Sequence, residues 1–175
     1  RQGDSFYWLG ILPSLSGGLV QECLILLGIY AVVFHRQPSS NRLALLGAFV
    51  AGAFGLAEAC YLAEPTTLLS WQLFERAARI VFHVSSGAVL GIALGSQMTK
   101  RYALIAGMIA ANSFILYLPV FVRQGAFSAQ SLHFALAAIS LAALVFSVVM
   151  IKRFRPIPQA AVSSPNSPLD ESVKP

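Results

Sequence analysis

Three ionisable side chains stand inside long apolar runs of the sequence, where a polar group is costly. Glu22 lies in the first of these runs, Glu58 in the second and His83 in the third. A charged or polar group at membrane depth is expensive, so each must be paired, neutralised, metal-bound or turned toward a cavity. Two carboxylates and an imidazole can bind a divalent metal and activate a water molecule, as hydrolytic zinc sites do. Glu22, Glu58 and His83 are therefore the candidate catalytic residues and ligands, with zinc the expected metal.

The runs that hold these residues have the length of membrane-spanning helices. The chain is 57% hydrophobic and 11% charged, whereas about a quarter of the residues of a soluble protein are charged. An apolar run of roughly 18 residues or more predicts a transmembrane helix. Such runs cover residues 13–34, 43–63, 78–98, 102–122 and 131–151. The sequence therefore predicts an all-α, polytopic membrane bundle of about five antiparallel helices within residues 1–151.

The net charge of +5 is distributed as a topology signal. Alternate ends of the runs carry Arg36, Arg42, Lys100, Arg101, Lys152, Arg153 and Arg155. Cytoplasmic loops of membrane proteins are rich in lysine and arginine, which puts the N-terminus outside and the C-terminus in the cytoplasm. We therefore expect a multi-pass protein of the plasma or inner membrane whose partners are the lipid bilayer and other membrane subunits, and no nucleic acid.

The segments at the two ends of the bundle have a different character. Pro13 and the pair Gly17 and Gly18 interrupt the first run, which predicts that a regular helix begins after them. Residues 152–175 are rich in proline and serine and poor in apolar side chains, so they predict a cytoplasmic tail that is disordered unless a partner binds it. Residues 70–79 predict an amphipathic start of the third helix, with Glu75 and Arg79 as an i,i+4 ion pair.

Small residues at every fourth position predict how the helices pack. The second run contains Gly47 and Gly55 with Ala51 between them, and the third contains Gly87, Gly91 and Gly95. Such series allow helix backbones to approach closely within a membrane. His83 continues the series of the third run at the same spacing, which directs its side chain into the bundle.

Each of the three polar residues also stands in a short motif. Phe54 precedes Glu58 by four residues, and a Glu75–Arg79–His83 series lies in the third run, while residues 17–25 approximate a Glu-Glu-x-x-Lys/Arg motif. Over residues 16–96 these motifs resemble the PrsW/YhfC-type intramembrane metalloproteases, relatives of the CAAX-processing and bacteriocin-processing membrane proteases. The resemblance implies a helical membrane fold, a zinc site and peptidase activity.

The sequence departs from the pattern of this family at four positions. Gln21 stands where the family has a glutamate that the resemblance would make the water-activating base, and Ile25 replaces a basic residue. Asn112 stands where some members carry a further histidine, and Leu116 where an acidic partner would follow. An amide cannot take a proton from water near neutral pH. The sequence therefore supports two functions: a catalytically impaired peptidase, or a non-catalytic subunit of a larger membrane complex.

A simpler explanation of the buried charges involves neither metal nor catalysis. Glu58 paired with His83, or bonded to Arg76 or Arg79, would satisfy these groups as an ordinary structural contact. Arg76, Arg79 and His83 share one helical face, since they are spaced at i, i+3 and i+7.

Other polar residues have weaker interpretations. His133, Ser140 and Ser147 recur at heptad spacing in the fifth run, which predicts a helix–helix contact. A haem held between His133 and the histidine of the third run is a more distant alternative. Cys23 and Cys60 are expected to be small buried residues and not a disulfide pair.

The predicted topology can be tested by cysteine-accessibility labelling. Single cysteines introduced at Ser39 and Ser164 should be labelled from the cytoplasmic side, and those at Thr67 and Ser128 from the outside, because the basic ends of the runs alternate. The reverse labelling pattern would show that the orientation is inverted.

Overall fold

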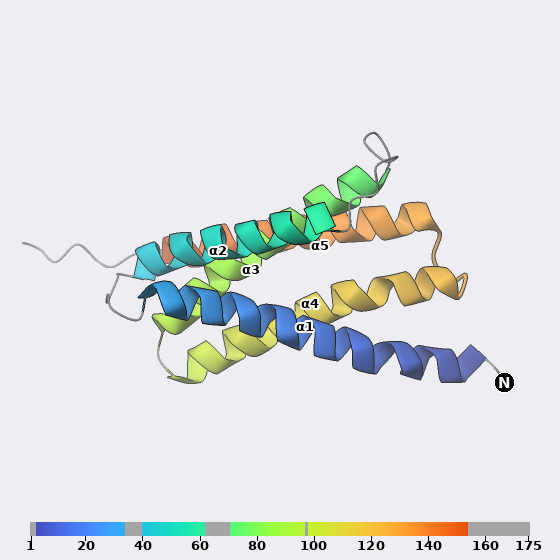
Figure 1. Cartoon of the computed structure of the whole chain (residues 1–175), viewed down its shortest axis with the longest axis horizontal. Helices are drawn as coiled ribbons and strands as arrows, with labels where there is room; N and C mark the ends of the chain where they lie inside the picture. The colour runs from blue at the N-terminus through green and yellow to red at the C-terminus, as the bar shows by residue number, and fades with distance from the viewer. Residues whose placement is uncertain (1–2, 34–39, 62–70, 97, 154–175) are drawn as a thin grey trace, which may run out of the picture.

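The computed structural model describes residues 3–33, 40–61, 71–96 and 98–153, and these form five long helices that run up and down along one axis (Figure 1). The helices are α1 Gly3–Val33, α2 Ser40–Tyr61, α3 Trp71–Leu94, α4 Met98–Arg123 and α5 Ala129–Arg153. Every one contains a stretch long and apolar enough to cross a membrane. The predicted fold class, an all-helical polytopic membrane bundle, is confirmed, and the part of the chain described here contains no strand.

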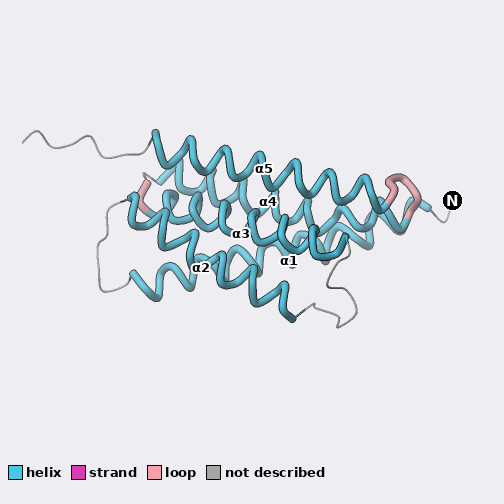
Figure 2. The backbone as a smooth tube through the Cα atoms, turned by 90° about the horizontal axis from the view of Figure 1, so that it is seen from above, coloured by secondary structure: helices cyan, strands magenta, loops and turns pink. Residues whose placement is uncertain are grey.

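Helix α3 is the centre of the bundle. In its most apolar stretch 67% of the residues are buried, compared with 17–28% in the other four helices. It packs most extensively against α2, then against α5 and α4, while α1 packs mainly along α4. Figure 2 shows the same bundle from above, with all five helices parallel or antiparallel to one long axis. A side chain of α3 can therefore meet residues from every neighbouring helix.

The contact between α2 and α3 is a direct approach of two backbones. A Cβ atom on Gly47 would collide with the carbonyl oxygen of Gly87, and one on Gly91 would collide with the carbonyl oxygen of Leu43. Small residues permit this approach, which favours helix association in lipid through van der Waals contact. Gly95, expected in the same series, lies instead in the exposed turn after α3, because the helix already ends at Leu94.

The prediction that a regular helix begins after Pro13 and the glycine pair was wrong. Helix α1 is continuous from Gly3 and includes Pro13. A proline removes one backbone donor, and membrane helices tolerate it where the freed carbonyl can find a partner other than the usual helical N–H. The glycines form the contact with α4: a Cβ on Gly18 would lie 2.7 Å from the backbone nitrogen of Ser113.

Two further expectations concern the cysteines and the C-terminal tail. Cys23 and Cys60 are exposed and not buried, because each lies on the side of its helix that faces away from the other helices. The predicted tail, residues 152–175, overlaps the end of α5 at Lys152 and Arg153; its remainder lies outside the described residues.

Replacing Gly91 by leucine should separate α2 from α3. The backbone of Leu43 leaves no space for a side chain at this position, so Gly91→Leu should lower the free energy of unfolding in detergent by about 1–3 kcal/mol or more. Gly107→Leu is the matched control, since nothing lies within 4 Å of a Cβ at Gly107. Equal stability of the two variants would contradict the backbone contact.

Candidate functional site

Glu58 on α2 and His83 on α3 lie in direct contact. The Oε2 atom of Glu58 is 3.0 Å from Nε2 of His83. Gly55 makes room for this arrangement, because a Cβ there would lie 3.1 Å from Cδ2 of His83. The ring of Phe54 packs edge-on against the imidazole, with 5.4 Å between the ring centroids. The spacing of Phe54, Gly55 and Glu58 on one helix therefore positions His83 of the next.

Gln21 connects this pair to two more helices. Its Nε2 donates a hydrogen bond to Oε1 of Glu58 at 3.2 Å, and its Oε1 accepts one from Nδ2 of Asn112 at 2.9 Å. A continuous series of polar contacts thus runs from Asn112 on α4 through Gln21 on α1 and Glu58 on α2 to His83 on α3. Both the nitrogen and the oxygen of the Gln21 amide therefore form hydrogen bonds.

Glu22 lies beside this series and has a partner of its own. It is fully buried, and its Oε2 accepts a hydrogen bond from Oγ of Ser86 at 2.6 Å. Its Oε1, like Nδ1 of His83, is buried without a hydrogen-bond partner in the described part of the protein. Ser86 stands one helical turn after His83, so Glu22 is adjacent to the Glu58–His83 pair without being bonded to it.

The predicted zinc ligands are only partly brought together. Glu58 and His83 meet, but Glu22 is held by Ser86 about one turn further along α3. Among the residues that the structure describes, no three histidine, cysteine or acidic side chains form a group that could hold a metal ion. Glu22, Glu58 and His83 are therefore not gathered into one three-ligand group in this arrangement, and zinc binding stays a prediction.

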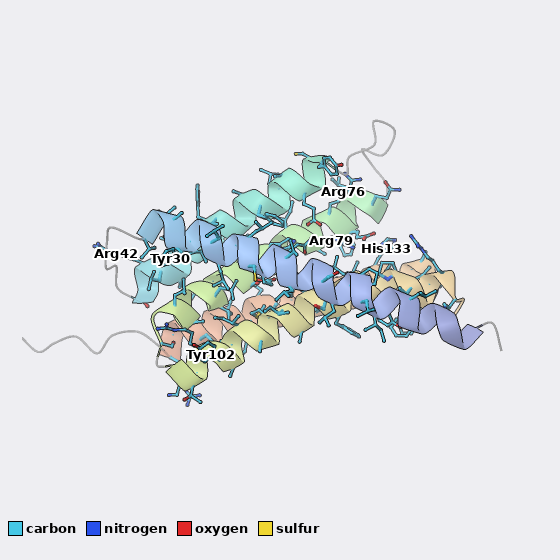
Figure 3. The ribbon with its side chains drawn as sticks, turned by 60° about the horizontal axis from the view of Figure 1, so that its bottom comes forward. Tyr30, Arg42, Arg76, Arg79, Tyr102 and His133 are labelled. Atoms are coloured by element: carbon cyan, nitrogen blue, oxygen red, sulfur yellow. The ribbon has the colours of Figure 1, made fainter. Side chains whose placement is uncertain are left out.

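Arg76 and Arg79 each bind a partner at their end of the bundle. Arg79 forms the predicted i,i+4 ion pair with Glu75 at 3.2 Å. Arg76 donates to the carbonyl oxygen of Ala59 at 2.7 Å and so binds the last turn of α2. Figure 3 shows both arginines at the same end of the bundle as His133, opposite the end that carries Arg42. The Glu58–His83 contact considered as a simpler explanation is observed.

The polar positions of α5 form part of its packing face. His133, Ser140 and Ser147 are buried, together with Leu132 and Leu136, and α3 is the main neighbour of this helix. Nδ1 of His133 lies 3.9 Å from a carboxylate oxygen of Glu75 on α3. These observations agree with the helix–helix contact that the heptad spacing predicted.

Ser86 and Asn112 belong to the site, although the sequence did not predict them as site residues. The hydroxyl of Ser85 bonds back within its own helix, donating to the carbonyl of Val81 at 2.7 Å. Ser86 instead donates to Glu22. Its position three residues after His83 was the signal, because both then share a helix face. Asn112 stood out only as a departure from the family motif.

No family model, curated protein or solved structure was found to match this chain. The likeness to the PrsW/YhfC-type proteases therefore rests on the motifs quoted above and stays a prediction.

The hydrogen bond between Ser86 and Glu22 predicts that replacing Ser86 lowers the free energy of unfolding more than replacing the adjacent Ser85. Ser86→Ala should lower the free energy of unfolding by about 1–3 kcal/mol, because it leaves a buried carboxyl group without its donor. Ser85→Ala should cost clearly less, since that hydroxyl bonds only within its own helix. Chemical unfolding in detergent micelles measures both. An equal cost for the two would show that the Glu22 contact contributes nothing specific.

Proposed function

We propose that this chain is an integral membrane protein of the PrsW/YhfC type that has lost peptidase activity and acts as a non-catalytic subunit of a membrane assembly. The observation that supports this most strongly is Gln21. It occupies the position of the expected base, and both groups of its amide are engaged, with Glu58 on one side and Asn112 on the other.

An amide in this position cannot perform the proton transfer that peptide hydrolysis requires. A general base must accept a proton from the attacking water within hydrogen-bond distance. The oxygen of Gln21 is instead committed to Asn112, and its nitrogen carries only donors. The neighbouring Glu58 accepts from Gln21 and contacts His83. The arrangement suits a structural connection between four helices better than the activation of water.

The outer face of α5 supports the subunit role. Only 17% of the most apolar stretch of this helix is buried within the chain. A groove lies on its exposed side, with small residues at Ala138 and Ala142 flanked by the larger Leu141, Val145 and Phe146. Small residues four positions apart are typical of membrane helix contacts. A helix of another subunit is the partner that such a surface fits.

Residual metal binding is a second candidate function. The observation that favours it is that two buried atoms at the site, Oε1 of Glu22 and Nδ1 of His83, have no hydrogen-bond partner in the described part of the protein. Buried polar groups are nearly always partnered. Metal analysis of the purified protein distinguishes the two candidates, because only the second predicts bound zinc near one ion per chain, lost in His83→Ala.

Exchange of Gln21 tests the proposal directly. The purified wild-type chain should not cleave quenched fluorescent transmembrane peptides, with or without added zinc. Gln21→Leu should lower the free energy of unfolding by about 1–2 kcal/mol, since it leaves Glu58 and Asn112 each short of a partner. Gln72→Leu is the control, because Gln72 is exposed on α3.

Two results of this experiment bear on catalysis. Zinc-dependent cleavage by the wild-type chain, abolished in His83→Ala, would contradict the loss of activity. Cleavage gained by Gln21→Glu but not by Gln72→Glu would support descent from an active peptidase, since the first variant alone restores the missing carboxylate.

A further inference from the structure

A groove lies where α1 meets α4, near the amino-terminal end of α1. It has a volume of about 250 Å³. Its lining residues are Leu9, Gly10, Pro13 and Ser14 on α1 and Val120 and Arg123 on α4. Gly10 keeps the helices close at this point, because a Cβ there would lie only 2.7 Å from Cγ2 of Val120. The groove therefore combines mainly apolar walls with the hydroxyl group of Ser14 and the cationic side chain of Arg123.

The backbone of α1 provides a hydrogen-bond acceptor in the same groove. Proline has no N–H group, so Pro13 cannot donate to the carbonyl four residues earlier. That carbonyl belongs to Leu9, which lines the groove together with Pro13. A backbone carbonyl that lacks its usual helical donor favours, in an apolar setting, a ligand that can donate a hydrogen bond.

The height of the groove matches the headgroup region of a bilayer. Helix α1 has 31 residues, or roughly 46 Å at 1.5 Å per residue, whereas the hydrocarbon core is about 30 Å thick. Arg123 is exposed and is the last residue of α4. Arg123 also lies at the end of the bundle that the distribution of basic residues assigns to the outside. Arginine is less common there than in cytoplasmic loops. This position favours an anionic ligand.

We propose that this groove binds an anionic phospholipid whose headgroup carries hydroxyl groups. The guanidinium group of Arg123 binds the phosphate, and the carbonyl of Leu9 accepts a hydrogen bond from a headgroup hydroxyl. The acyl chains lie along the adjacent apolar face of α1, where Leu9 is 70% and Leu12 is 73% exposed. This continuity between a cationic groove and a lipid-facing helix surface favours a phospholipid over a soluble anion.

Native mass spectrometry of the full chain with three phospholipids of identical acyl chains tests the charge contact. Phosphatidylglycerol should bind more tightly than phosphatidylcholine to the wild-type protein. Arg123→Gln should weaken phosphatidylglycerol binding about fivefold, the effect of one cation near a headgroup, and leave phosphatidylcholine unchanged. Arg153→Gln removes an equal charge at the opposite end of the bundle and should have little effect. The third lipid, phosphatidylmethanol, is anionic but has no headgroup hydroxyl.

Pro13→Ala tests the carbonyl contact separately. It returns an N–H group to α1, so the Leu9 carbonyl regains its partner within the helix. Phosphatidylglycerol binding should then fall to the level of phosphatidylmethanol, while both remain above phosphatidylcholine. Thermal unfolding checks that each variant is folded.

Three outcomes would overturn the proposal. The first is phosphatidylglycerol binding that is unchanged in Arg123→Gln. The second is an equal loss in Arg153→Gln, which would indicate general attraction to a basic protein. The third is full displacement of the lipid by millimolar inorganic phosphate, which would indicate a site for free anions.

Discussion

The close approach of the α2 and α3 backbones is the contact on which the other features of the bundle depend. Gly47 and Gly91 have no side chains to separate the two helices, so each rests on a backbone carbonyl of its neighbour. Because lipid offers no hydrophobic drive between helices, such packing and interhelical hydrogen bonds must hold them together. One consequence is that Gly55 lies against His83, which brings the imidazole within 3.0 Å of Glu58.

Polar side chains add a second set of contacts between the helices. At membrane depth a polar group needs a partner, and here α1 and α4 supply it through Gln21 and Asn112. An amide is suited to this place because it donates on one side and accepts on the other. The same two-sided bonding is what makes Gln21 unsuitable as a base. In the proposed function, one side chain therefore both joins the helices and leaves the site without a base.

The sequence predicted the helices well because their signal is local. Each apolar run marks a span, and small residues at every fourth position, in the series that begin at Gly47 and Gly87, mark a close contact. Gly95 kept the spacing but lies past the end of α3, since a spacing does not show where a helix stops. The partners within the site were harder to predict. A helix that is apolar on nearly all faces gives little sign of which side is turned inward, so the orientation of Asn112 emerged only from the packed bundle.

The hydrogen bond between Gln21 and Asn112 is the most direct test, because it is the contact that commits the amide oxygen. A double-mutant cycle would compare Gln21→Leu, Asn112→Leu and the double variant by their free energies of unfolding in bilayer-like micelles. If the two side chains are bonded, the double variant should be more stable than the sum of the single effects predicts, by about 1 kcal/mol. Strictly additive effects would contradict the account, because they would leave the amide oxygen of Gln21 uncommitted.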